Sequence, residues 1–329
     1  MLAWSTTETP GVLARSVRPI PDISDHELLV RVEACGVCRT DLHVIDGELG
    51  THRAGRVPGH QIVGTVVRTG RLVTRISTGA RVGIAWLRST CGTCRWCRQG
   101  RENLCPDSVF TGWDVDGGFA EYTTVPEAYA YMLPVVSDVD IAAPLLCAGI
   151  IGFRALTRSA LPPGGRLGLY GFGSSAHITA TLARATGAEL FVMTRGEENR
   201  ALARSMGCEF VGDALASPPV PLDSALVFAP AGELVPAALR STTRGGTVVL
   251  AGIHMSQIPA MDYQAHLFYE RDLKSVTSNT RSDGDALLRV ARALNVTPIV
   301  TRYPFERTAD AVNDLRAGAT SGSLVITGT

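Results

Sequence analysis

Four cysteines lie close together in one short stretch, CGTCRWCRQGRENLC. They are Cys91, Cys94, Cys97 and Cys105, with the spacing Cys-x2-Cys-x2-Cys-x7-Cys. Four thiolates from one loop satisfy the tetrahedral coordination that zinc prefers and leave no position open for a substrate. A disulfide framework is the alternative, but the N-terminal sequence MLAWSTTETP lacks the apolar core of a secretory leader. The stretch therefore predicts a structural zinc site.

The other four cysteines are Cys35, Cys38, Cys147 and Cys208. Cys38, in GVCRTDLH, and His60, in GHQIVG, each lie beside glycine at an expected strand edge, and Cys147 lies in PLLCAG. Two thiolates and one imidazole are a usual ligand set for a catalytic zinc, whose fourth position holds water or substrate. Taken singly, each residue is more simply explained as a buried free cysteine or a surface histidine.

The segment GFGSSA matches the G-x-G-x-x-A fingerprint of dinucleotide-binding turns, directly after an apolar strand and before an expected helix. The first glycine makes the turn, the second lets pyrophosphate approach the backbone, and the alanine allows close packing of helix on sheet. Helix-terminal amides then face the phosphates. The cofactor-binding residues expected from this fingerprint are Gly171, Phe172, Gly173, Ser174, Ser175 and Ala176.

The next strand, LFVMTR, ends at Thr194 and Arg195, where an NAD-binding turn carries an Asp or Glu for the ribose 2′-hydroxyl. Arginine can pair with a 2′-phosphate, so the sequence favours NADP over NAD, with Thr194 and Arg195 as contacts. Glu197 and Glu198 follow closely and leave NAD open, although they also suit the first turn of a helix.

The elements that carry these residues change in character near residue 140. Short apolar runs and turns over 25–135 predict an antiparallel, barrel-like domain, and alternating strands and helices afterwards predict a doubly wound parallel sheet. We expect an α/β protein with a zinc-binding domain at 1–140, completed by 285–329, and a Rossmann domain at 141–284. The 31 basic and 31 acidic residues balance, which gives no reason to expect nucleic-acid or membrane binding.

GVCRTDLH, GHQIVG and the four-cysteine loop, followed by a Rossmann unit, resemble the zinc-dependent alcohol dehydrogenases of the medium-chain dehydrogenase/reductase superfamily, with a GroES-like catalytic domain. The resemblance covers essentially the whole chain. It implies that Cys38, His60 and Cys147 bind a catalytic zinc, and that the four-cysteine loop binds a structural one. It also implies the following roles: Thr40 and His43 in a proton relay, Asp41 in orienting the ligand histidine, and Arg39 at the pyrophosphate.

The family motif reads Gly-His-Glu, whereas Gln61 follows His60 here. Glutamine is neutral and is a poorer zinc ligand than glutamate. Because two thiolates already balance the charge of zinc, we expect metal binding to persist. We expect the exchange of water for substrate to be what differs, so that Gln61→Glu alters turnover more than zinc content.

The resemblance places Trp86 in the substrate pocket, and Trp113 lies near the predicted metal loops. Packing in the core would explain each tryptophan equally well. If both line the pocket, they predict an apolar substrate: a primary aliphatic or aromatic alcohol, or the matching aldehyde. The expected activity is reversible hydride transfer to a nicotinamide cofactor in a cytoplasmic homo-oligomer, either a dimer or a tetramer. The alternatives are a cinnamyl-type dehydrogenase or other aldehyde reductase, and a non-catalytic zinc-binding interaction module.

Overall fold

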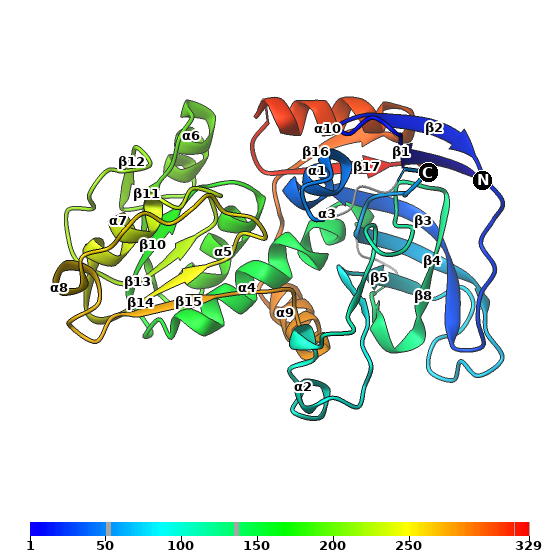
Figure 1. Ribbon diagram of the computed structural model, residues 1–329, viewed down its shortest axis with the longest axis horizontal. Helices are drawn as coiled ribbons and strands as arrows, with labels where there is room; N and C mark the ends of the chain where they lie inside the picture. Colours follow the sequence, from blue (N-terminus) through cyan, green and yellow to red (C-terminus); the bar gives the residue numbers. More distant parts are fainter. Residues whose placement is uncertain (51–53, 135–137, 319, 329) are drawn as a thin grey trace. The chain divides into compact units, whose positions relative to one another are not determined.

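The computed structural model describes residues 1–50, 54–134, 138–318 and 320–328, and the chain divides into two compact units (Figure 1). Unit 1 contains Met1–Cys147, Ser278–Asp285 and Pro298–Thr329. Unit 2 contains Ala148–Thr277 and Ala286–Thr297. The chain thus leaves unit 1 and returns to it twice.

Unit 1 consists mainly of strands joined by turns and short helices. Its elements are β1 (Leu2–Thr6), β2 (Leu13–Val17), β3 (Glu27–Val37), α1 (Arg39–Asp46), β4 (Gln61–Thr69), β5 (Arg81–Ile84), β6 (Leu87–Ser89), α2 (Arg95–Arg98), η1 (Glu102–Leu104), β7 (Val109–Phe110), β8 (Tyr122–Pro126), η2 (Glu127–Tyr129), β9 (Ala130–Met132), α3 (Val139–Ala142), η3 (Ala143–Leu146), β16 (Val300–Pro304), η4 (Phe305–Arg307), α10 (Thr308–Ala317) and β17 (Ser323–Thr327).

The main sheet of unit 1 has the order β16-β17-β3-β4-β5-β9, and β8 also pairs with β3. All of these pairs are antiparallel except β16 with β17. The central strand β3 is almost entirely buried, as its apolar sequence ELLVRVEACGV predicts. Its register pairs Gly36 with Gln61. The chain leaving β3 and the chain entering β4 therefore meet at the same end of these two strands.

Unit 2 alternates helices and strands, as the sequence predicts. Its elements are α4 (Ala148–Ser159), β10 (Arg166–Tyr170), α5 (Ser174–Arg184), β11 (Glu189–Met193), α6 (Glu197–Ser205), β12 (Phe210–Gly212), β13 (Leu222–Val227), α7 (Leu234–Ser241), β14 (Thr242–Leu250), α8 (Tyr263–His266) and β15 (Asp272–Ser275).

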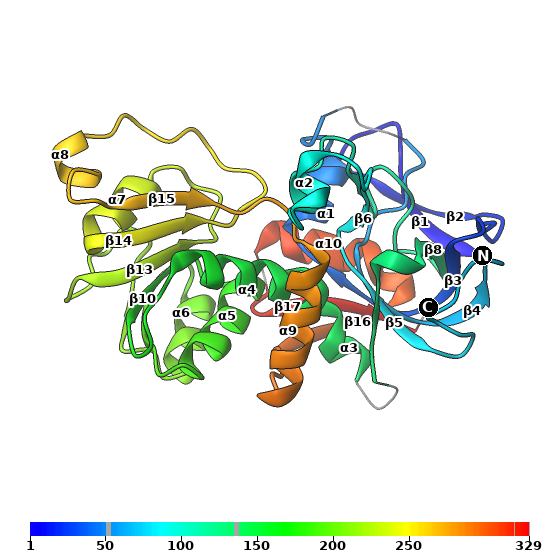
Figure 2. The ribbon, with the colours of Figure 1, turned by 90° about the horizontal axis from the view of Figure 1, so that it is seen from below.

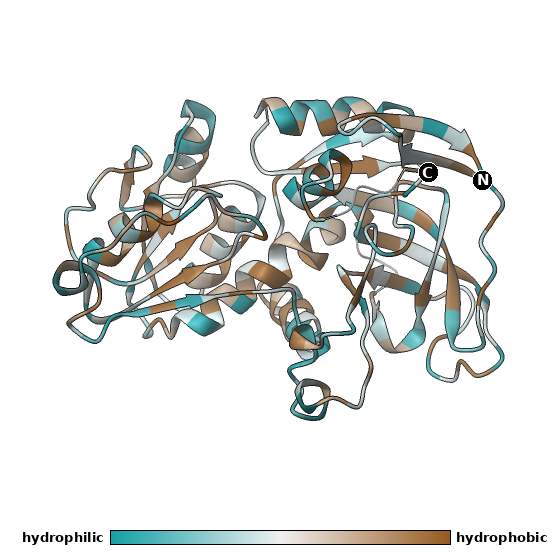
Figure 3. Ribbon diagram, viewed as in Figure 1, coloured by the Kyte–Doolittle hydropathy of each residue, from teal (hydrophilic) through white to brown (hydrophobic). Residues whose placement is uncertain are grey.

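The six strands of unit 2 are all parallel, in the order β12-β11-β10-β13-β14-β15 (Figure 1). Figure 2 shows β13, β14 and β15 side by side. Leu167 and Leu169 of β10 pack with α4 and α5 on one face, whereas Tyr170 packs with α7 on the other. The strands are apolar because both faces are covered (Figure 3). The strand order reverses between β10 and β13, where doubly wound sheets bind nucleotides. The predicted α/β class is confirmed.

The unit boundaries differ by a few residues from those expected from the sequence. The first lies after Cys147 rather than after residue 140, because α3 and η3 pack on β3 and β4. Helix α9 (Arg281–Ala293) begins in unit 1 and ends in unit 2, whereas the sequence placed the return at residue 285. Its first turn belongs to unit 1 because the Arg281 amide donates to Glu102 Oε1 at 2.9 Å.

Within the described residues, no single helix is long and apolar enough to cross a membrane. Two consecutive helical segments, Val139–Leu146 and Ala148–Ser159, are separated by a bend of 45°. Taken together, they are long and apolar enough to cross a membrane, by length and composition alone.

Candidate active site and structural metal site

Cys38, His60 and Cys147 converge in unit 1, where β3 ends and β4 begins. Their ligand atoms all lie within 4.8 Å of one another, and Cys38 Sγ is 3.5 Å from His60 Nε2. Cys38 follows β3 and His60 precedes β4, so the antiparallel register brings them together. Cys147 joins them from the bend between η3 and α4. The spatial cluster matches the ligand set that the family resemblance implies.

Gly59 is needed for His60 to reach this position. Its φ of 94° lies in the left-handed region, and a Cβ there would come within 2.6 Å of the Phe119 ring and 2.9 Å of Cys35 Sγ. A side chain at this position would therefore push the histidine segment away from the buried end of β3.

Asp41 ties the two ligand-bearing segments together, beyond the orienting role that the resemblance implies. Its Oδ2 accepts from the Cys38 amide at 2.8 Å, and its Oδ1 accepts from the Gly59 amide and from His60 Nδ1, both at 3.1 Å. The carboxylate is only 1% exposed. Because the carboxylate accepts a hydrogen bond from Nδ1, it fixes the tautomer of the His60 ring that is protonated at Nδ1. His60 Nε2 then faces the cysteine sulfurs.

The electrostatics of this cluster suit a cation. A hydrogen bond with Cys147, together with burial, raises the pKa of the Cys38 thiol well above its usual range. Burial disfavours the charged form of His60, but Asp41 and Cys38 outweigh it and raise the pKa of the ring to about 10. Two crowded sulfurs and an imidazole on a buried carboxylate are the donor set of an open-sided zinc site. The residues present therefore fit the metal.

Thr40 and His43 lie on α1, three residues apart, so their side chains share one side of the helix. Thr40 is buried, and the His43 side chain is 12% exposed. His43 forms a hydrogen bond through Nδ1 to Glu48, and it lines a small hollow with Trp113. Arg39, at the start of the helix, is exposed. The sequence analysis missed Glu48, although Gly47 after a helix was a signal for the turn that carries it.

Trp86 and Trp113 belong to an aromatic stack beside the cluster. Trp86 meets the His60 ring edge-on at 5.0 Å, and Trp113 stacks on Trp86 at 6.1 Å. Phe110, which the sequence analysis missed, stacks on both, at 5.1 Å from Trp86 and 5.8 Å from Trp113. Phe110 reaches the stack because β6 pairs with β7. Both strands are too short for this pairing to be predicted from the sequence.

The loop that carries Cys91, Cys94, Cys97 and Cys105 gathers all four sulfurs within 4.8 Å. Individual sulfur pairs lie 3.5 to 4.0 Å apart. A zinc–sulfur bond of about 2.3 Å gives tetrahedral edges of about 3.8 Å, whereas a disulfide needs about 2.05 Å. Backbone hydrogen bonds from Thr93 and Cys94 lower the pKa of the Cys91 thiol to about 6. The loop therefore fits a closed zinc site.

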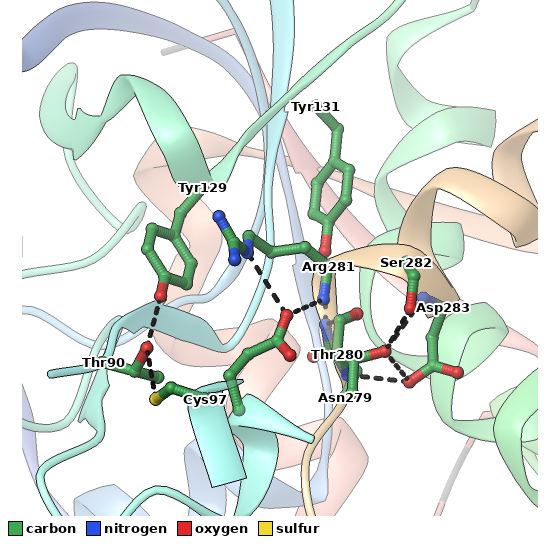
Figure 4. A network of polar contacts seen from close by, with 10 residues as sticks. Thr90, Cys97, Tyr129, Tyr131, Asn279, Thr280, Arg281, Ser282 and Asp283 are labelled. Carbon is green, nitrogen blue, oxygen red and sulfur yellow. Dashed lines mark hydrogen bonds and ion pairs between the residues drawn. The ribbon is translucent and has the colours of Figure 1, made fainter. Parts of the chain in front are cut away.

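Glu102, within this loop, binds the start of α9. Its side chain is 5% exposed, and Oε1 accepts from the Arg281 amide at 2.9 Å and from Arg281 Nε at 3.2 Å. Figure 4 shows the surrounding network, in which Thr90 lies between Cys97 and Tyr129. The four-cysteine loop thus also anchors the segment through which the chain returns to unit 1.

In unit 2, the turn after β10 has the geometry that the glycine fingerprint predicts. Gly171 has a φ of 89°, and a Cβ there would lie 3.0 Å from the Ala229 amide nitrogen. Gly173 caps α5 and is exposed, and a Cβ there would meet no atom within 4 Å. Ser174 and Ser175 open the helix, and Ala176 is fully buried. The turn therefore leaves room for a phosphate at the helix N-terminus.

Thr194 and Arg195 differ in exposure. Thr194 is buried, and its hydroxyl accepts from the Phe172 amide at 3.2 Å, so it supports the glycine turn. Arg195 is exposed at the end of β11. Glu197 is bound by Arg200 and Arg204 on its own helix, and their hydrogen bonds lower the pKa of its carboxyl. Glu197, one of the two alternative carboxylates for a ribose, is therefore already paired.

Comparison with known proteins identifies the family of the chain. Residues 24–135 match the alcohol dehydrogenase GroES-like domain. A probable alcohol dehydrogenase, AdhA, from Mycobacterium tuberculosis is 53% identical over 99% of this chain and 97% of its own length.

Solved structures extend this likeness to the whole fold. A cinnamyl alcohol dehydrogenase from Sorghum bicolor has a TM-score of 0.91 at 27% identity, covering 99% of this chain and 97% of that one. A dehydrogenase from Sinorhizobium meliloti, solved with NADP bound, has a TM-score of 0.87 at 27% identity, with both chains fully covered. The chain belongs to the zinc-dependent alcohol dehydrogenases of the medium-chain dehydrogenase/reductase superfamily.

Proposed function

We propose that the chain transfers hydride reversibly between a primary aliphatic or aromatic alcohol, or its aldehyde, and a nicotinamide cofactor, at the site of Cys38, His60 and Cys147. The observation that carries this proposal is the convergence of these three ligand atoms within 4.8 Å, with Asp41 behind His60. When bound, zinc supplies a Lewis acid for the substrate oxygen, and the nicotinamide accepts or donates hydride.

The residues around the site would transfer the proton of the substrate hydroxyl. Thr40 would accept the proton of the substrate hydroxyl while passing its own to His43, and the reverse would hold for aldehyde reduction. A relay of this kind is useful because the site is largely closed to water: Thr40 and Asp41 are buried. Asp41 would hold both ligand segments fixed while the proton moves.

We propose that each chain binds two zinc ions, the second in the four-cysteine loop. The tetrahedral spacing of the four sulfurs supports this count. All eight cysteines are free of disulfides, which suits a reducing compartment, and we propose the cytoplasm. Metal analysis of the purified protein tests the count: two zinc ions per chain are expected, and one would contradict the assignment.

We propose NADP(H) as the preferred cofactor, through the exposed Arg195 and the backbone of the turn from Gly171 to Ala176. Arg39 is the proposed pyrophosphate contact. Two observations support this preference: Glu197 is held in ion pairs, and the dehydrogenase from Sinorhizobium meliloti was solved with NADP. An arginine–phosphate contact gives strong charge-assisted hydrogen bonds, whereas a ribose hydroxyl gains little from it.

Arg195→Gln tests this preference. The KM for NADP(H) should rise by about tenfold or more because a charge-assisted contact is lost, and the KM for NAD(H) should stay constant. Arg166→Gln is the matched control, because Arg166 pairs with Glu189 at the other end of β11 and should leave both KM values unchanged. An equal change for both cofactors in Arg195→Gln would contradict the preference.

The aromatic stack of Trp86, Phe110 and Trp113 supports an apolar and, in particular, an aromatic substrate. It favours a second candidate function, a cinnamyl-type dehydrogenase working mainly as an aldehyde reductase, and the likeness to the Sorghum bicolor enzyme points the same way. A non-catalytic zinc-binding module is not supported, because the match to an alcohol dehydrogenase spans 99% of the chain.

We also propose that the chain forms a homo-oligomer. β15 lies at the edge of the parallel sheet, and Tyr263, Phe268 and Tyr269 form an exposed aromatic cluster just before it. Edge strands and exposed aromatic clusters are typical of protein interfaces. Light scattering coupled to gel filtration tests this, and a monomer at micromolar concentration would contradict it.

A steady-state screen tests the proposed reaction. Aliphatic, benzylic and cinnamyl alcohols and their aldehydes would be assayed with NAD(H) and NADP(H) in parallel, using the zinc-loaded protein. We expect oxidation of primary alcohols with NADP. Preferential reduction of cinnamaldehyde would instead establish the second candidate, and no turnover with any pair would contradict both.

A further inference from the structure

The end of helix α1 folds back on itself. Gly47 has a φ of 76°, and its amide lies 3.3 Å from the Val44 carbonyl. The amide of the next residue, Glu48, donates to the His43 carbonyl at 2.9 Å. This left-handed turn is a common way to end a helix, and it reverses the chain over the last turn. It therefore places the Glu48 side chain beside the His43 ring.

The two side chains are in direct contact. A Glu48 carboxylate oxygen forms a hydrogen bond with His43 Nδ1. An ionised carboxylate only accepts hydrogen bonds, so Nδ1 must carry the proton. In the neutral ring, Nε2 is then the proton acceptor. The side chain of His43 is 12% exposed and that of Glu48 is 49% exposed, so the contact runs from the protein interior toward water.

We propose that Glu48 is a positioning residue for the proton relay: it holds His43 in the tautomer that can take a proton at Nε2, and it stabilises the imidazolium that results. This inference rests on the proposed relay through Thr40 and His43. During alcohol oxidation, the substrate proton reaches Nε2 by way of the Thr40 hydroxyl. His43 becomes cationic beside the Glu48 carboxylate and then loses a proton to water. Aldehyde reduction runs the same transfers backwards.

The other carboxylate at this end of α1 has a different task. Asp46 Oδ1 pairs with Arg316 at 2.7 Å, which ties α1 to α10. Asp46 is therefore a matched control: it is an acidic residue on the same helix end, but it forms a surface ion pair with an arginine instead of a histidine. Such pairs contribute little to stability.

Kinetics of single and double variants test the inference. Glu48→Ala and Glu48→Gln should lower kcat by about tenfold with little change in KM, because a hydrogen bond to a charged group is lost. Glu48→Asp should restore most of the rate, and Asp46→Asn should match the wild type. In a His43→Ala background, Glu48→Ala should have no further effect, because residues that act through one another are not additive. Zinc content and circular dichroism check folding.

A spectroscopic measurement gives a readout independent of turnover. Nitrogen NMR of protein labelled at histidine should show His43 protonated at Nδ1 in the wild type. In Glu48→Ala, the ring should lose this fixed tautomer. A wild-type ring protonated at Nε2 alone would overturn the inference.

The kinetic outcomes test the role of Glu48 separately from the proposed relay through Thr40 and His43. If His43→Ala is impaired but Glu48→Ala turns over like the wild type, the inference is wrong and the relay stands. The same holds if the two effects multiply in the double variant. If His43→Ala itself turns over at the wild-type rate, the proposed relay is wrong and the inference falls with it.

Discussion

The two candidate metal centres of unit 1 are assembled in opposite ways. The four sulfurs of one come from the stretch 91–105, and those of Cys91 and Cys105 accept hydrogen bonds from amides of the same loop. The ligands of the other come from positions 38, 60 and 147, and they meet only when β3 pairs with β4 and η3 packs on both strands. One site is a property of a loop, and the other is a property of the fold.

This difference has energetic consequences. A short loop loses little entropy when its ends close on a metal, so it can form its site locally. The three-ligand site depends on a buried carboxylate and a fixed strand register, and it leaves a coordination position open. Changes in the loop should therefore mainly affect stability, whereas changes at the three-ligand site should mainly affect chemistry.

Removing a ligand from the three-ligand site should have the largest effect on turnover. Cys147→Ser should lower kcat by at least about a thousandfold, because loss of the metal removes several kcal/mol of charge stabilisation. Zinc analysis should find one ion per chain, held by the four-cysteine loop. Cys208→Ser is the control, because Cys208 belongs to neither cluster, and it should match the wild type. Wild-type turnover in Cys147→Ser would sink the ligand assignment.

Asp41→Asn should have the next largest effect. The amide keeps the size of the carboxylate but loses its charge, so the His60 tautomer and both ligand segments are held less firmly. Partners of metal-binding histidines are typically worth about 10- to 100-fold in affinity or activity. Zinc affinity and kcat measure this loss. Asp46→Asn, on the same helix, should change neither, and an equal effect of both substitutions would contradict the role of Asp41.

The same contrast explains what the sequence could predict. The cysteine spacing and the glycine fingerprint are local patterns, so the four-cysteine zinc site and the dinucleotide-binding turn could both be predicted from the sequence. The strands β3 and β4 were also evident from their apolar runs, but their register was not, and the three-ligand site came from family resemblance. Contacts between residues far apart in the sequence could not be predicted: Glu102 and Arg281, for example, are 179 positions apart. Phe110 joined the stack through a pairing of two very short strands.

Gln61→Glu should have a smaller effect on turnover, of a few fold up to about tenfold, with zinc content unchanged. Gln61 is buried at the start of β4, directly after the ligand His60. A carboxylate there adds charge beside the metal, which alters the exchange of water for substrate more than the affinity of a site with two thiolates. Parallel kcat and zinc measurements test this. Lost zinc with unchanged turnover would show that the interpretation is wrong.

In the four-cysteine loop, Cys94→Ser should reverse the pattern of Cys147→Ser. Zinc analysis should again find one ion, but the turnover of the folded protein should remain within about twofold of the wild type, because a closed site performs no chemistry. The midpoint of thermal unfolding should fall, because a structural zinc contributes directly to folding free energy. A loss of turnover as large as that of Cys147→Ser would erase the distinction between the two centres.

Glu102→Gln should leave turnover unchanged and lower only stability. The Glu102 carboxylate is buried against Arg281; burial by itself raises its pKa, but hydrogen bonds and the charge of Arg281 outweigh this and lower it. A carboxyl whose folded-state pKa lies below its unfolded value of about 4.3 stabilises the fold above that pH. Its contribution disappears as the pH falls through the folded-state pKa. At pH 6 to 8, the variant should therefore be less stable by a constant amount of about 1 to 2 kcal/mol.

Below about pH 4, the difference between Glu102→Gln and the wild type should shrink toward zero, because the wild-type carboxyl becomes neutral as well. Chemical unfolding of both proteins at each pH measures this difference, and acid release of zinc affects both alike. Glu197→Gln is the control, since Glu197 forms ion pairs on an exposed helix, and no resolvable change is expected. A difference that does not shrink as the pH falls would mean that the loop anchors α9 through the shape of Glu102 and not through its charge.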